Sequence, residues 1–135
     1  MAKSKPQGSL DTNVLLRLIL GDVPAQTDAV EHLLAKGGVF KVSDAAITEM
    51  IYVLEKVLGK DRSLIQENVL AITRHKQFST NAKLFERCMP LYCSYPKLSI
   101  VDCVLVAYAE LDKTPLHTFD KDLAKYSDNT AHLLN

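Results

Sequence analysis

The sequence predicts an α/β fold in which a mainly parallel sheet is covered by helices. Short stretches rich in β-branched and aromatic residues alternate along the chain with longer segments of helical spacing. The length of 135 residues suits a single domain, and the chain has neither a repeat nor a low-complexity tract. Such alternation is typical of parallel sheets, whose functional sites lie at the carboxyl ends of the strands.

Two helices are predicted near the amino terminus. Val14–Leu20 is a dense apolar run that stops at Gly21, as expected of a short buried helix with a glycine C-cap. Either Thr12 or Asn13 would cap its start. Pro24 then occupies the first turn of a second helix, which a pair of glycines ends.

The middle of the chain predicts a strand and three helices. Residues 39–43 are β-branched and aromatic, and helical spacing follows them at once. Residues 62–75 and 81–93 have the spacing of amphipathic helices, and the second of these should be strained or kinked at Pro90, which has no N–H group to donate. Residues 77–79 form a segment too short to assign.

The last part of the chain predicts two helices and two strands. Ser99 opens a helix over residues 100–111, and residues 116–119 form an extended stretch. Asp120 begins a short helix, and residues 131–134 are expected to form the final strand.

Charge and cysteine content limit the possible functions. Sixteen basic residues balance sixteen acidic residues, so any binding of nucleic acid must be local. The three cysteines lack CxxC spacing, which argues against a disulfide framework or a zinc site and favours the reducing cytoplasm. Residues 1–9 lack the apolar region of a secretory signal, no stretch predicts a membrane span, and we expect residues 1–9 to be a leader that is partly a cloning remnant.

Two carboxylates in the first half of the chain each have an ordinary structural explanation. Asp11 precedes the first helix, where it is equally consistent with an N-cap and with a metal ligand at a strand end. Glu49 lies opposite the apolar face of its predicted helix, which on its own indicates a solvated side chain. Neither position alone distinguishes a structural role from metal binding.

Two further carboxylates follow later in the chain. Asp102 stands in a helix that is apolar on nearly every side, where an unpaired charge is costly; a capping box with Ser99 is the alternative, and the two roles can coexist. Asp120 and Asp122 flank Lys121, and only one of these two acids is needed to cap the short helix.

A cluster of carboxylates would suit hard cations. Magnesium and manganese prefer oxygen ligands, and a pair of such ions can assist phosphodiester hydrolysis. Without a cation, the clustered charges would repel one another. The spacing of the four acids along the chain does not by itself bring them together.

Four segments together resemble the motifs of PIN-domain nucleases, in the same order along the chain. The resemblance is closest to VapC toxins of bacterial and archaeal VapBC toxin–antitoxin modules. The segments are Leu10–Leu16, Val42-Ser43 with Glu49 on the next helix, Leu98–Asp102 followed by alanines, and Leu116–Leu123.

The resemblance implies a three-layer α/β/α sandwich on a parallel sheet, with residues 10–135 as the PIN-like domain. It implies four catalytic and metal-binding acids around one or two magnesium or manganese ions, with the first and third as the most direct ligands. These are Asp11, Glu49, Asp102 and Asp120. It also implies that Thr12, Asn13 and Thr118 orient the ligands and the scissile phosphate, while Asp122 is peripheral. Because residues 5–10 are poor in strand formers, the first strand is expected to be short or replaced.

By the same resemblance, the chain is expected to be a metal-dependent endoribonuclease that acts as the toxin of a toxin–antitoxin pair. Its partners would be an RNA substrate, a second copy in a homodimer, and an antitoxin whose tail brings a basic side chain over the acidic pocket. The alternatives are a non-catalytic RNA-binding or scaffolding module and an enzyme that acts on small phosphoesters.

Overall fold

The computed structural model describes residues 5–135, which form two compact units. The first unit extends to Asn81 and the second begins at Ala82, and each is described by itself. Residues 1–4, part of the expected leader, lie outside the described residues.

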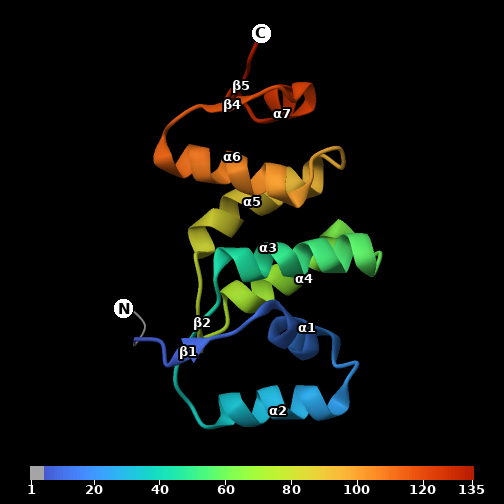
Figure 1. The fold of residues 1–135 in the computed structure, drawn as a ribbon, viewed down its shortest axis with the longest axis vertical. Coiled ribbons are helices and arrows are strands. Elements are labelled where there is room, and N and C mark those ends of the chain that lie inside the picture. Colours follow the sequence, from blue (N-terminus) through green and yellow to red (C-terminus); the bar gives the residue numbers. More distant parts are fainter. Residues whose placement is uncertain (1–4) are drawn as a thin grey trace. The chain divides into compact units, whose positions relative to one another are not determined.

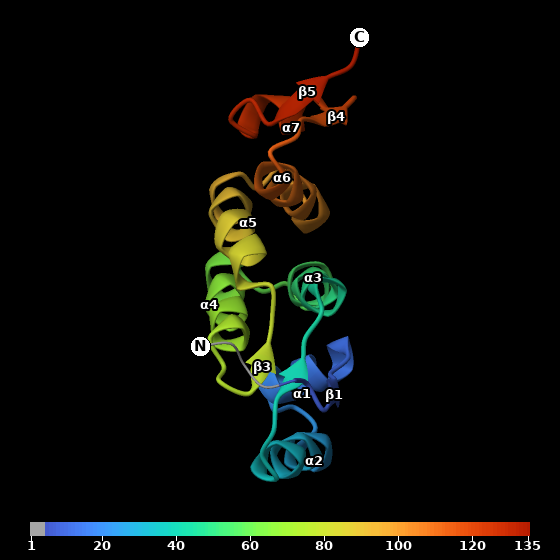
Figure 2. The same cartoon turned by 90° about the vertical axis from the view of Figure 1, so that its left-hand side faces the viewer.

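The first unit contains a three-stranded parallel sheet, of which Figure 1 labels β1 and β2 and Figure 2 labels β3. Its strands are β1 (Gly8–Ser9), β2 (Phe40–Lys41) and β3 (Phe78–Ser79), in the order β1-β2-β3. The ladder continues beyond these strands, because the Leu10 N–H donates to the Lys41 carbonyl and the Val42 N–H donates to the Ser79 carbonyl, both at 2.9 Å. The parallel pairing of the three strands therefore extends beyond the two residues assigned to each.

The helices of the first unit follow the predicted order. They are α1 (Thr12–Leu20), α2 (Pro24–Ala35), α3 (Asp44–Tyr52), the π-helix η1 (Val53–Val57) and α4 (Arg62–Thr73). Helix α1 lies between α2 and α3 and contacts both, and α4 packs against α3 and β3 (Figures 1 and 2). The core between these elements consists of fully buried apolar side chains, among them Leu15, Ile47, Leu54, Ile65 and Phe78.

The start of α1 corrects one prediction. The N-cap is Asp11, and neither Thr12 nor Asn13 has this role, because the helix begins at Thr12. The backbone of Asp11 is extended, and its side chain accepts a hydrogen bond from the N–H of Val14, as a capping aspartate does. At the other end Gly21 has φ 60°, which confirms the predicted glycine C-cap.

The second unit combines two packed helices with a pair of parallel strands. Its elements are α5 (Ala82–Ser94), α6 (Ile100–Asp112), β4 (Leu116–Thr118), α7 (Lys121–Tyr126) and β5 (Ala131–Leu133). Helix α5 packs along α6, and β4 pairs with β5, with both strands close to α7 (Figure 2). All pairings between the described strands are parallel, so the α/β prediction is confirmed.

The contact between α5 and α6 buries two thiols. Cys88 and Cys103 are both fully buried, and helix α5 continues past Pro90. Burial raises the pKa of the Cys88 thiol far above its usual value, and the neighbouring Cys103 and Cys93 raise it further. Cys88 therefore stays a neutral thiol and acts as a small apolar side chain. Among the described residues, no helix is long and apolar enough to cross a membrane.

Candidate metal centre

The carboxyl ends of the three strands in the first unit carry polar residues. Asp11 follows the last ladder hydrogen bond of β1, Ser43 and Asp44 follow β2, and Thr80 and Asn81 follow β3. Because the strands are parallel, these residues gather at one edge of the sheet, where α/β proteins place their ligands.

The Asp11 carboxylate is held by the helix that it caps. Its Oδ1 accepts a hydrogen bond from the Val14 N–H at 3.0 Å, while the side chain remains exposed. The next residue, Thr12, is buried, and its hydroxyl donates to the Ala46 carbonyl at 3.4 Å. This contact ties the start of α1 to the first turn of α3. Asn13 is exposed in the first turn of α1.

Glu49 lies on α3, three residues beyond the point where Thr12 contacts this helix. Residues three apart in a helix are neighbours on its surface, so Glu49 is about one turn from Ala46. Its side chain is exposed. Asp11 caps α1 and Glu49 lies on α3, and these two helices contact each other in the first unit.

Asp102 combines a capping role with an apolar helix. Its Oδ2 accepts from the Ser99 N–H at 3.1 Å, and its own N–H donates to the Ser99 hydroxyl, also at 3.1 Å. This is the capping box that the sequence left as an alternative. The helix around it is buried at Ile100, Cys103 and Val106, yet Asp102 itself is partly exposed.

Asp120 caps α7 in the same manner. Its Oδ1 accepts from the N–H groups of Asp122 and Leu123 at 2.9 and 3.1 Å. Its own N–H donates to the Thr118 hydroxyl at 2.9 Å, so Thr118 fixes the turn between β4 and α7. Asp120 is therefore the cap of α7, and only one of the two acids beside Lys121 has this role.

The three aspartates share one arrangement. In each of them, one carboxylate oxygen accepts a hydrogen bond from one or two backbone N–H groups at the start of a helix. The other carboxylate oxygen accepts no hydrogen bond from the described residues of the same unit. A carboxylate has lone pairs on both oxygens, so a capping bond orients the group and leaves one oxygen able to bind a cation.

The four acids divide between the two units. Asp11 and Glu49 belong to the first, and Asp102 and Asp120 belong to the second. Within residues 5–135, neither unit by itself contains a group of three or more histidine, cysteine, aspartate or glutamate side chains that could hold a metal ion. The convergence of all four acids stays a prediction.

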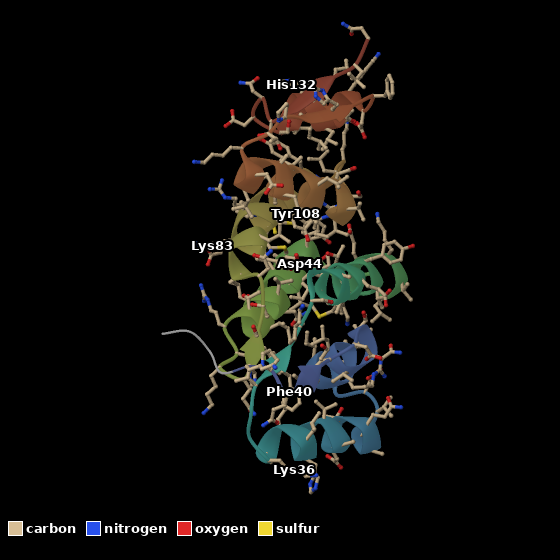
Figure 3. All side chains as sticks on the ribbon, turned by 60° about the vertical axis from the view of Figure 1, so that its left-hand side comes forward. Lys36, Phe40, Asp44, Lys83, Tyr108 and His132 are labelled. Carbon is tan, nitrogen blue, oxygen red and sulfur yellow. The ribbon has the colours of Figure 1, made fainter. Side chains whose placement is uncertain are left out.

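Sequence reasoning missed Asp44. It lies at the start of α3 (Figure 3), where its Oδ2 accepts from the Asn81 amide at 3.2 Å. The two residues border a cavity of about 610 Å³ at the carboxyl ends of β2 and β3. The sequence does place polar residues directly after the segments that form β2 and β3. Residues 77–79, however, were too short to assign as a strand, so the second segment was not recognised.

Comparison with known proteins identifies the family. The chain matches the family model described as the PIN domain over residues 9–129. Comparison with curated proteins gives no significant match. The matched region contains all four predicted acids and extends over both units. The chain therefore belongs to the PIN-domain family.

Proposed function

We propose that the chain is a metal-dependent endoribonuclease, with Asp11, Glu49, Asp102 and Asp120 as its catalytic and metal-binding residues. PIN domains are generally metal-dependent nucleases, and the match covers most of the chain. The observation that carries the proposal is the shared arrangement of the three aspartates, each oriented by its own helix start and each with one carboxylate oxygen left over.

The donor set suits Mg²⁺ or Mn²⁺. All four side chains offer carboxylate oxygens, the ligands that these hard cations prefer, whereas zinc would favour nitrogen and sulfur. One or two bound ions would stabilise negative charge on the attacking and leaving oxygens of a phosphodiester. Asp11 and Asp102 would be the direct ligands, and Glu49 and Asp120 would support the metal or hold the proton of the attacking water.

The polar neighbours would position these acids and the RNA. Thr12 anchors the start of α1 on α3, and Thr118 fixes the turn that precedes Asp120. The exposed amide of Asn13 would donate to the scissile phosphate from the first turn of α1, where backbone N–H groups also favour an anion.

We further propose that the chain is a cytoplasmic toxin controlled by an antitoxin, and that it forms a homodimer. Clustered carboxylates without a cation repel one another, so they would attract a basic side chain as well as a metal. An arginine from the antitoxin would pair with two carboxylate oxygens at once. The antitoxin and the cation would then compete for the same oxygens.

The proposed activity predicts that the purified protein cleaves RNA with manganese and not with a chelator. The assay offers an RNA mixture and a small phosphoester side by side, because an extended RNA chain supplies binding energy that a small phosphoester lacks. Gel electrophoresis then follows the RNA, and colour release follows the small substrate. Cleavage of RNA alone supports the proposal. Binding of RNA without cleavage at any manganese concentration would instead indicate a non-catalytic RNA-binding module.

A further inference from the structure

Two tyrosines stack on each other in the second unit. Tyr95 follows the end of α5 and Tyr126 ends α7, and their ring centroids are 4.4 Å apart with an interplanar angle of 22°. Both side chains are half-buried. The ammonium group of Lys125 lies 5.1 Å from the centroid of the Tyr126 ring, within the range of a cation–π contact.

The tyrosine pair borders two hollows. One has a volume of about 490 Å³ and is lined by the pair together with Arg87, Lys125 and Asp128, among others. The other has a volume of about 420 Å³, and the pair lines it together with Pro96 and Lys97. The two tyrosines thus form a wall that both hollows share, and each hollow has at least one cationic side chain in its lining.

The charge around this wall favours an anionic ligand. Lys97 and Lys125 are exposed, and the Arg87 side chain is 51% exposed although it pairs with Glu110 at 3.3 Å. Asp128 is the acidic residue among those that line the two hollows. The chain as a whole has no net charge, so this is a local excess of positive charge beside aromatic rings.

We propose that the two hollows lined by Tyr95 and Tyr126 form a binding track for single-stranded RNA. Proteins hold single strands by stacking bases on aromatic rings and by placing cations along the phosphates, and this wall offers both. The bases would stack on the tyrosines, while Lys97, Lys125 and Arg87 would contact phosphates. The track rests on the proposed ribonuclease function and adds to it a preference for unpaired segments.

The track is joined to two of the predicted catalytic acids by short segments. Helix α7 begins directly after Asp120 and ends at Tyr126, a rise of about 9 Å along the helix axis. Tyr95 lies four residues before Ser99, whose side chain forms the capping box with Asp102. One RNA strand bound along the wall would therefore extend toward the acids of the second unit.

Binding of a labelled twelve-nucleotide uridine RNA to the full chain tests the proposal. Fluorescence anisotropy is measured in chelator, so that binding is separated from cleavage. We expect Tyr95→Ala and Tyr126→Ala each to raise Kd by about 5-fold to 150-fold, the range spanned by the stacking of one base on an aromatic ring. The corresponding Tyr→Phe variants keep the ring and should bind as the wild type does. The chain has no tryptophan and five tyrosines, so the part of the tyrosine quenching that is lost in the Tyr→Ala variants reports stacking on this pair.

The lysines give a second readout that leaves the tyrosine stack intact. Lys97→Ala and Lys125→Ala should each reduce the slope of log K against log salt by about 0.7, the value for one phosphate contact on a single strand. Two exposed residues of the same unit serve as matched controls, Lys83→Ala on α5 and Tyr108→Ala on α6 (Figure 3). Both lie outside the two hollows and should leave Kd and the salt slope unchanged.

Unchanged binding in folded tyrosine variants would overturn the track. If the alanine variants do not fold, unchanged salt slopes in the lysine variants would overturn it equally. A proline-rich peptide that binds these hollows while RNA does not would assign them to a protein partner, against the proposal. Tyrosine-dependent binding without any cleavage would support the track while contradicting the ribonuclease activity, so the two failures are distinguishable.

Discussion

The Asp102→Asn substitution is expected to lower manganese-dependent RNA cleavage by about 100-fold or more. Removal of a residue that only hydrogen-bonds to a metal ligand already lowers metal affinity or activity by about 10-fold to 100-fold. Loss of a direct ligand should lower them at least as much. The amide oxygen of asparagine can still accept the hydrogen bond of the Ser99 N–H, so the capping box and the helix should persist. The loss would then come from the missing charge on the carboxylate.

Cleavage rates from a gel assay at saturating manganese measure this effect. Asp112→Asn is the matched control, because Asp112 ends the same helix and is exposed. Thermal unfolding of both variants verifies the fold. Wild-type cleavage by a folded Asp102→Asn variant would remove Asp102 from the proposed site.

The Phe78→Ala substitution should destabilise the first unit by about 3–5 kcal/mol, the usual cost of removing a buried phenylalanine. The Phe78 side chain lies on the edge strand β3 and is fully buried, and its ring stacks on His75 with centroids 4.0 Å apart. A small protein has a free energy of unfolding of about 5–15 kcal/mol, so this loss is a large fraction of the total.

Urea unfolding gives the change in the free energy of unfolding. Phe119→Ala is the matched control, because the Phe119 side chain is 77% exposed and its loss should change stability by no more than about 0.5 kcal/mol. If Phe78→Ala changes the free energy of unfolding as little as Phe119→Ala does, Phe78 is not part of the folded core.

The helices were predictable because their apolar spacing and end signals agree. Gly21 ends α1 and Ser99 caps α6 as the sequence indicates, and Pro90 does not interrupt α5. The π-helix after Tyr52 was not predicted. Its apolar residues continue the spacing of α3, so the pattern does not reveal a change in hydrogen bonding.

The short strands were less predictable, because their pairing comes from distant segments. Strand β1 consists of Gly8 and Ser9, which have low strand propensity, and β3 consists of Phe78 and Ser79. Both are strands because each pairs in parallel with β2. Local sequence cannot supply a partner that lies about thirty or more residues away in the chain, so such strands depend on tertiary context.

The capping roles of two candidate-site residues were predictable from the sequence, and the contacts around them were less so. Sequence patterns offered capping or metal binding for Asp11 and Asp102, and the structure shows the capping bond in each. The contact of Thr12 with Ala46 and the pairing of Asp44 with Asn81 join segments that are distant in sequence. Such contacts appear only once the strands are placed in register.

Binding of Mn²⁺ to the wild type and to four single variants tests the proposed function most directly, because the proposal assigns all four acids to metal binding. The variants are Asp11→Asn, Glu49→Gln, Asp102→Asn and Asp120→Asn, with Asp122→Asn as the control. Titration calorimetry should show that each of the four weakens the same manganese site by about tenfold or more, while the control does not. If Asp11→Asn and Glu49→Gln leave manganese affinity unchanged while Asp102→Asn weakens it, the four acids do not form one centre.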